Sequence, residues 1–263
     1  MHVCITSVGI AGPGLEGWAA AQPILAGLTE YRPAPISHAI PDILSAAERR
    51  RSSQSARLAI MAAQDALLAG GVGGDEIATV FASSDGDGAI TQEICETLAG
   101  TAREVSPTSF HNSVYNAPAG YWSIATRSRL TSTTVCAYDV SFAAGLLEAA
   151  AYAEVEQQPV MLIASDIPFP APLHAIRPVE ESFAAALLLS PTAPAGPCMR
   201  WEISLEPHRT ATAFPHGLPE GLRSNPAARC LPLLAVLASP MVATVTLEYS
   251  DDSDLVVLCK PEG

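Results

Sequence analysis

The sequence predicts a layered α/β protein whose sheets are buried. Short apolar runs such as residues 77–83 and 160–164 are bounded by turn-forming residues, as interior strands are. Helical segments alternate with these strands, and the one at 141–155 carries Ala, Leu, Phe, Gly and Tyr around nearly its whole surface. Because a helix that is apolar on every side must be covered on every side, this segment is expected at the centre of the layers.

Size and composition agree with a layered fold. The chain has 263 residues, of which 49% are apolar and 16% charged. This is enough to bury a substantial core in one large domain or two small ones.

The first 190 residues contain most of the predicted elements. Ser45 and Glu48 form an S-x-x-E capping box, which starts a helix that ends before Gly70. Pro118 stands at the first turn of another helix, and the β-branched run at 131–136 predicts a strand. In order, the predicted elements are a strand at 2–10, a helix at 45–68, a strand at 77–83, helices at 91–98 and from 118, a strand at 131–136, a helix at 141–155, and strands at 160–164 and 182–189.

The composition changes after residue 190. Residues 190–197 form a linker of Pro, Ala, Thr and Gly, and residues 207–226 are irregular. The remaining elements are a strand at 199–205, a helix at 229–237 and a hairpin at 242–248 and 255–259. We therefore expect a first half at 1–190 and an abbreviated second half at 191–263 packed on it.

Charge and hydropathy argue against two kinds of partner. Fourteen basic and 27 acidic side chains give a net charge of −13, whereas binding to a phosphate backbone draws on clustered Lys and Arg. No apolar run reaches the ~18 residues that span a bilayer. The first residues also lack the basic and apolar regions of a signal peptide. We expect no nucleic acid, no membrane span and a cytoplasmic location.

Motifs for metals and cofactors do not survive a spacing test. The six cysteines and six histidines are dispersed without a CxxC pair, so the cysteines are expected to be reduced and mostly buried, with no metal site. The opening GIAGPGLEG lacks the GxGxxG spacing of a dinucleotide site, and the DGDG loop lacks the other ligands of a calcium loop. No cofactor is expected.

Several segments, taken together and in order, resemble the N-terminal half of β-ketoacyl synthases of the thiolase-like fold. The resemblance is greatest to the short synthase-like proteins that accompany aryl polyene gene sets. The segments, besides the opening strand with its Gly-rich loop, are ASSDGDG at 82–88, SPTSFHNSVYNAPAGYWSIA at 106–125, TSTTVCAYD at 131–139, SFAAGLLEAAAYA at 141–153 and VMLIASD at 160–166.

The resemblance implies a thiolase-like layered αβαβα fold with a truncated C-terminal half. It also implies a two-fold dimer in which the strand at 131–136 pairs across the interface. Such synthases condense an acyl chain held on a cysteine with a malonyl unit on an acyl carrier protein. That chemistry uses a thiolate at a helix N-terminus and two histidines that assist decarboxylation and stabilise the enolate.

The nucleophile position carries a different residue in this chain. Synthases read roughly T-V-D-T-A-C, whereas this chain reads TVCAYD, which places Asp139 where the cysteine belongs and Cys136 three residues early. A carboxylate cannot form the exchangeable thioester. We therefore expect no catalytic residue here, and interpret Asp139 as a replacement that accepts hydrogen bonds from the helix N-terminus.

The histidines of the family have no clear counterpart. The segment PHRTAT at 207–212 superficially resembles the synthases' H-G-T-G-T, but it follows Asp139 too closely and has Arg and Ala where glycines belong. We interpret the similarity as coincidence. His111 is expected to be a satisfied polar residue near the interface.

A chain that keeps the dimerising half and loses these groups resembles a chain length factor, the inactive subunit of a heterodimeric type II β-ketoacyl-ACP synthase that makes polyene or fatty acyl chains. The resemblance implies a full-length ketosynthase as partner, and contact with an acyl carrier protein only through that partner. The net charge of −13 agrees with indirect contact, because carrier proteins are themselves acidic and like charges disfavour direct docking. The side chains implied at the acyl tunnel or interface are Phe110, Asn112, Tyr115, Asn116, Thr133, Val135 and Cys136.

Three alternatives stay open on the sequence alone. The chain could be an active thiolase-like condensing enzyme that uses Cys136 if the register is shifted by three residues. It could be a scaffold that stabilises a synthase without setting product length. A nucleotide-binding oxidoreductase is the third, although its fingerprint fails.

Overall fold

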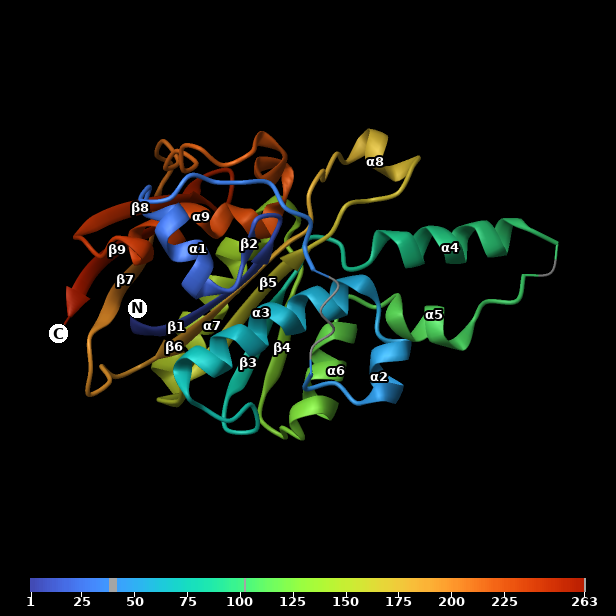
Figure 1. Ribbon diagram of the computed structural model, residues 1–263, viewed down its shortest axis with the longest axis horizontal. Coiled ribbons are helices and arrows are strands. Elements are labelled where there is room, and N and C mark those ends of the chain that lie inside the picture. The colour runs from blue at the N-terminus through green and yellow to red at the C-terminus, as the bar shows by residue number, and fades with distance from the viewer. Residues whose placement is uncertain (38–41, 102, 263) are drawn as a thin grey trace.

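The computed structural model describes residues 1–37, 42–101 and 103–262 (Figure 1). Within them the strands are β1 His2–Gly12, β2 Leu15–Glu16, β3 Ala78–Ala82, β4 Ser132–Val135, β5 Val160–Asp166, β6 Phe183–Ser190, β7 Cys198–Pro207, β8 Ala243–Glu248 and β9 Ser253–Glu262. The α-helices are α1 Trp18–Leu25, α2 Ala46–Arg51, α3 Gln54–Gly70, α4 Gly88–Ala99, α5 Pro107–Asn112, α6 Ala117–Thr126, α7 Ser141–Glu156, α8 Leu173–Ile176 and α9 Leu231–Ala238. Short 3-10 helices are η1 Tyr138–Val140, η2 Glu220–Ser224 and η3 Pro226–Cys230.

The strands form one mixed sheet in the order β4-β3-β5-β6-β1-β7-β9-β8, with β2 paired to β1. Strands β4, β3 and β5 are parallel, and every later neighbour pair is antiparallel. Helices lie on both faces of this sheet (Figure 1). The predicted α/β class is confirmed, as are the strands at the predicted places, including the closing hairpin β8–β9.

One face of the sheet is covered by α3 and α6. The buried side of α3 is rich in alanine, which lets the helix lie close to β1, β5 and β6. Trp122 and Tyr121 of α6 are almost fully buried in the same cluster. Small residues on a helix allow a sheet and a helix to approach without voids, so this layer is thin and tightly packed.

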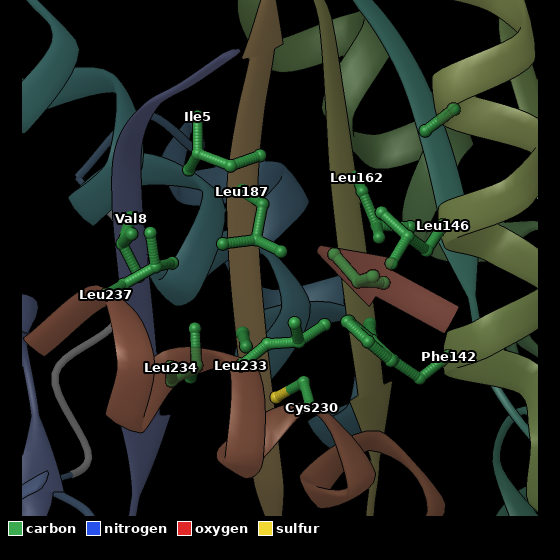
Figure 2. Packing of buried hydrophobic residues seen from close by; sticks show 14 of the residues in the cluster. Ile5, Val8, Phe142, Leu146, Leu162, Leu187, Cys230, Leu233, Leu234 and Leu237 are labelled. Carbon is green, nitrogen blue, oxygen red and sulfur yellow. The ribbon is translucent and has the colours of Figure 1, made fainter. Parts of the chain in front are cut away.

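The other face is covered by α7, α9 and η3. Phe142 and Leu146 of α7 pack against β5, and Leu233, Leu234 and Leu237 of α9 lie over β1 and β6 (Figure 2). Each such leucine contributes about 1.5–3 kcal/mol by leaving water. This cluster is the larger of the two cores.

The abbreviated second half extends the sheet of the first half. Residues His2–Ile5 of β1 pair with Met199–Glu202 of β7, and β9 and β8 follow. Trp201, Ile203 and Val257 from these strands belong to the same core as α7 and α9. The described part of the chain therefore builds one continuous sheet, where the resemblance implied a stack of two. The predicted boundary between the halves lies directly after β6, and the division stays a prediction.

The helix predicted at 45–68 is two helices. Ser45 does accept from the Glu48 N–H at 3.2 Å, so the capping box forms as predicted. Ser52 and Ser53 then take extended backbone conformations, and Ser53 Oγ accepts from the Ala56 N–H as a second N-cap. A single long helix was therefore wrong here, because serine side chains compete for backbone groups and start a new helix.

Helix α7 is buried on one broad side rather than all round. Phe142, Leu146 and Ala149 are buried, but Val155 is 76% exposed and the residues between these two sides are half-buried. The prediction of a helix covered on every side was wrong for this chain by itself. In the described residues no helix combines the length and the apolar character needed to cross a bilayer.

Helices α4 and α5 form an arm that extends away from the sheet (Figure 1). Gly88 is the buried residue of α4 and Asn112 is that of α5, so the arm has little core of its own. Ser109 Oγ donates to Glu93 Oε1 at 2.8 Å and ties the two helices together. Phe110 is 68% exposed at the surface of this arm.

The contact between β1 and α3 depends on the absence of a side chain at Gly9. A Cβ there would lie 2.0 Å from the Ala62 carbonyl oxygen and 2.6 Å from the Ala66 nitrogen, both backbone atoms. We expect Gly9→Ala to lower the free energy of unfolding by about 3 kcal/mol or more, because neither backbone can move aside. Urea unfolding followed by circular dichroism measures this change.

The matched control is Gly120→Ala in α6, where an added Cβ meets nothing within 4 Å. It should be neutral or stabilise by up to about 1 kcal/mol, as Ala is the better helix former. A Gly9→Ala variant as stable as the Gly120→Ala variant would contradict the close packing of β1 on α3.

Candidate functional site

The chain turns sharply between β4 and α7. Tyr138 has a φ of 53°, a left-handed conformation that is uncommon for a residue with a Cβ. Ser141 Oγ accepts from the Ala137 N–H at 2.9 Å and donates to the Tyr138 carbonyl oxygen at 2.7 Å. Residues 136–141 therefore form a sharp turn from strand to helix, here called the elbow, and Ser141 at the start of α7 holds it.

Asp139, which the sequence analysis predicted at the nucleophile position, is bound by two arginines. Arg177 Nη2 lies 2.8 Å from Asp139 Oδ1, and Arg229 Nη2 lies 3.4 Å from Asp139 Oδ2. Helix α7 has no side-chain hydrogen bond at its N-cap. The expectation that Asp139 caps the helix was wrong, because two guanidinium groups are stronger partners for a carboxylate than peptide N–H groups.

Arg177 connects three segments that are far apart in the sequence. Its Nε donates to Asp85 Oδ2 at 2.8 Å in the loop after β3, and its guanidinium stacks on the Tyr138 ring at 3.6 Å. Burial lowers the pKa of Arg177, but the hydrogen bond and charge of Asp139 outweigh it, so the pKa is raised. The permanently charged side chain thus fixes the conformation of the elbow.

The Cys136 thiol is held as a hydrogen-bond donor. Although the residue is exposed as a whole, its Sγ donates to the Ser84 carbonyl oxygen at 2.9 Å. Burial of the sulfur raises the pKa of Cys136, and the negative charges of Asp85 and Asp166 raise it further. The positive charge of Arg177 lowers the pKa of Cys136, but by less than the other effects raise it. Such a thiol is a poor nucleophile near neutral pH.

A buried carboxylate lies beneath the elbow. Asp166 ends β5 and is 3% exposed, and its Oδ1 accepts from Ser84 N at 2.7 Å and from the Ser83 and Ser84 hydroxyls. Burial raises the pKa of Asp166 to about 6, against the lowering effect of these hydrogen bonds and of Arg177. Asn225 Nδ2 donates to the Asp166 carbonyl oxygen at 2.9 Å, which links the site to the second half.

A cavity of about 350 Å³ opens beside Asp139. Phe142, Phe214 and Leu247 form apolar parts of its wall, and Arg229 and Glu248 pair at 2.5 Å on it. Its lining also contains Ala211 and Thr212 from the segment that resembles the synthase histidine motif.

His208 of that segment makes a different contact. Its Nδ1 lies 3.2 Å from Asp254 Oδ1, and it does not line the cavity. His111, the histidine expected near the interface, packs edge-on against the Tyr121 ring with centroids 5.8 Å apart. Among the described residues, none of the hydrogen bonds of Asp139 or Cys136 involves a histidine.

The predicted tunnel residues divide into two groups. Phe110 on α5 and Tyr115 and Asn116 in the turn to α6 are exposed. Asn112 is buried, and its Nδ2 donates to the Arg51 carbonyl oxygen at 2.8 Å. Within the described chain Asn112 therefore anchors α5 to α2.

Thr133 and Val135 lie on β4, at one end of the sheet, where both are half-buried. They pair with Val80 and Ala82 of β3. Together with Cys136, which directly follows β4, they are the predicted interface residues at this edge of the sheet.

Arg177, Arg229 and Asp166 were missed as site residues. Asp166 closes the VMLIASD motif, so a carboxylate at the end of a buried strand could have been noticed. Arg177 follows the short helix α8 and Arg229 lies in the 3-10 helix η3, and no spacing rule connects them with Asp139.

The family of the protein follows from its sequence and fold together. The model for the N-terminal domain of β-ketoacyl synthases matches residues 18–239, and the chain belongs to this family. Its fold is a thiolase-like ketosynthase fold with a truncated second half. The resemblance inferred from the sequence is confirmed. A comparison with curated protein sequences finds no match.

Solved structures with this fold include complexes of two synthase-like subunits. One is a ketosynthase (ApeO) in complex with its chain length factor (ApeC) from Xenorhabdus doucetiae, with a TM-score of 0.73, 21% identity, and 98% of this chain and 99% of that chain covered. The ishigamide ketosynthase/chain length factor has a TM-score of 0.78 at 14% identity, with 100% of both chains covered. At these identities the similarity shows a shared fold.

The raised pKa of Asp166 makes stability depend on pH. A carboxyl group with a folded-state pKa of about 6 and an ordinary value of 3.8 binds more protons when folded, so stability falls as pH rises from 4 to 6. We expect Asp166→Asn to remove this fall. The unfolding free energy of the variant, relative to wild type, should rise by about 2 kcal/mol between pH 4 and 7.

Urea unfolding of both proteins at several pH values measures this difference. The pH dependence contributed by the other carboxylates is the same in both proteins and cancels. The same substitution at the exposed Asp75 serves as the control and should leave the pH dependence unchanged. A constant difference between the Asp166→Asn variant and wild type across this range would contradict the buried, proton-binding carboxyl.

Proposed function

We propose that the protein is a non-catalytic, chain-length-factor-like subunit of a heterodimeric type II β-ketoacyl-ACP synthase. It binds a full-length ketosynthase, closes the acyl tunnel at the interface, and acts in polyene or fatty acyl synthesis in the cytoplasm. The observation that carries the proposal is Asp139 at the nucleophile position, bound on both oxygens by Arg177 and Arg229. No thioester can form on this carboxylate.

The state of Cys136 supports the same conclusion. The alternative in which Cys136 is the nucleophile requires a thiolate and a nearby base. Its thiol instead donates to a carbonyl oxygen, and its pKa is raised, chiefly by burial. The condensing chemistry is therefore assigned to the partner.

The free edge of β4 supports a partner that adds strands. The carbonyl oxygens of Thr131 and Val135 accept from the N–H groups of Thr79 in β3 and Ser83 directly after it, at 3.0 and 3.2 Å. Because backbone groups alternate along a strand, those of Ser132 and Thr134 point to the open edge. β4 ends the sheet, and an unpaired edge of this kind is a ready template for another chain.

Exposed apolar side chains on the arm and at the elbow also fit a protein interface. Phe110, Val114 and Tyr115 on and after α5 are at least half exposed, as is Tyr138 at the elbow. The arm of α4 and α5 has little core of its own, so a partner that covers it would also stabilise it. The net charge of −13 disfavours direct docking of an acidic carrier protein, which leaves that contact to the partner.

Pairing through β4 can be tested with one backbone hydrogen bond. Thr134→Pro removes an N–H on the open edge and leaves the groups that bind β3 in place, and proline is tolerated on edge strands. Co-expressed with its ketosynthase, the wild-type chain should co-purify at a ratio of one to one. We expect Thr134→Pro to weaken that complex at least 10-fold while the chain itself stays folded.

The control is Thr134→Val, which keeps the N–H and should bind as wild type does. The purified wild-type chain alone should not extend an acyl-carrier substrate, whereas the complex should. Condensation by the lone chain would overturn the proposal. Undiminished binding by a folded Thr134→Pro variant would exclude β4 pairing.

Tyr115 distinguishes a length-setting subunit from a scaffold. It is 51% exposed at the predicted tunnel end. In the complex, Tyr115→Ala should lengthen the acyl product and Tyr115→Trp should shorten it, as measured by mass spectrometry of the carrier-bound chains. Leu28→Ala, an exposed apolar position after α1, is the control for general surface effects. An unchanged product distribution in both Tyr115 variants would indicate a scaffold.

A further inference from the structure

The sheet brings together two cysteines that are far apart in the sequence. Cys4 of β1 and Cys198 of β7 lie with Glu262 of β9, and their Sγ and carboxylate oxygen atoms are all within 4.8 Å of one another. Cys4 Sγ is 3.7 Å from Glu262 Oε2. No metal site was expected from the sequence because the cysteines are dispersed along the chain, but the pairing of β1 with β7 brings these two close together.

The register of the strands disfavours a disulfide between the two cysteines. Cys4 pairs with Arg200, so Cys198 is its diagonal neighbour, two residues further along β7. Diagonal neighbours have Cα atoms about 7–8 Å apart, beyond the usual range of about 4.4–6.8 Å for a disulfide. A tetrahedral zinc ion with Zn–S bonds of about 2.3 Å instead holds its two sulfurs about 3.8 Å apart.

We propose that Cys4, Cys198 and Glu262 bind one divalent thiophilic ion of the zinc type, with a water molecule as fourth ligand. The donor set suits such an ion, since zinc binds thiolates and carboxylates together. Cys4 is buried and backs the site, whereas Cys198 and Glu262 are half-buried and leave an entry path from solvent.

The charges of the site balance with the ion bound. Without metal, two neutral thiols stand beside Glu262, whose carboxylate is paired with Arg200 through Nε–Oε2 at 2.7 Å and Nη2–Oε1 at 2.8 Å. Binding releases two thiol protons as the doubly charged cation enters, so the sum of charges stays the same. Arg200 can keep Oε1 while Oε2 turns to the metal, which orients the ligand in the way that outer partners of metal ligands do.

The position of the site gives it a structural role. The first half and the second half share the short ladder between β1 and β7, four residue pairs long, and the three ligands come from β1, β7 and β9. The ion would therefore clip the abbreviated half to the first strand. Further along β7 and β9, the diagonal neighbours Glu202 and Lys260 form an ion pair, Lys260 Nζ to Glu202 Oε1 at 2.6 Å.

Cobalt and zinc titrations of the full-length chain, prepared reduced and metal-free, test the proposal. Cobalt should produce a thiolate-to-metal charge-transfer band and the visible spectrum of a tetrahedral ion, at one ion per chain. Zinc should bleach that spectrum at the same stoichiometry, bind in competition with a chromophoric chelator, and raise Tm. Cys198→Ser should lose the charge-transfer band, bind zinc at least 100-fold more weakly, and show no rise in Tm.

The variants are chosen so that a loss of zinc binding cannot be mistaken for a failure to fold. Cys198 is half-buried, so Cys198→Ser should fold, whereas the buried Cys4 is left unchanged. Glu262→Gln should weaken zinc binding about 10-fold or more. The controls are Cys95→Ser, an exposed cysteine of α4, and Glu202→Gln in the ion pair further along β7, and both should bind as wild type does.

Three outcomes would overturn the proposal. The first is a wild-type chain without the cobalt band or with zinc binding only at millimolar concentration. The second is undiminished binding in Cys198→Ser. The third is a Cys4–Cys198 disulfide that forms readily on mild oxidation of the metal-free chain, detected as the loss of two free thiols, since it would show that the register does not separate the two backbones as argued.

Discussion

Strand β1 is the constraint on which the rest of the structure depends, because it is paired on both edges and covered on both faces. On one edge it holds β6 and through it the parallel strands that lead to the elbow, and on the other it holds β7 and the second half. Its faces contact α3 on one side and α9 on the other. Gly9 is where the first of these contacts is closest. A first strand placed at the centre of the sheet lets a short second half join an existing core instead of building one.

The layered class and nearly all strands could be predicted, because interior strands are short apolar runs between turn residues and are recognisable as such in a sequence. The capping box at Ser45 could also be predicted, because its pattern is local in the sequence. The break at Ser52 and Ser53 was not, since serine is compatible with both a helix interior and a cap, and only the path of α3 over β1 decides between them. The continuation of one sheet through β7 was also beyond the sequence, because strand pairing between distant segments leaves no local signal.

The candidate site could be predicted as a position but not as a set of interactions. Counting along the family motif predicted Asp139 where synthases carry the cysteine, and in the structure Asp139 lies in η1, within the turn between β4 and α7. Arg177 comes from the segment before β6 and Arg229 from η3 after it, so only the fold brings them to Asp139. The same holds for Cys4 and Cys198, which are 194 positions apart and meet because β1 and β7 are neighbours. A site whose residues each come from a different, distant segment leaves no spacing motif in the sequence, so it cannot be predicted from the sequence alone.

An aspartate at the start of α7 changes what the surrounding residues must do. A synthase needs a reactive thiolate there, with room for an acyl group and for two histidines. A carboxylate in the same place needs counter-charges, and here they are supplied from the segment after β5 by Arg177 and from the abbreviated half by Arg229. Arg229 also binds Glu248 of β8, so the elbow, η3 and the closing hairpin form one charged chain. The residues after β6 therefore contribute more than extra strands, since Arg229 holds Asp139 in a fixed, charge-paired state next to the end of β4.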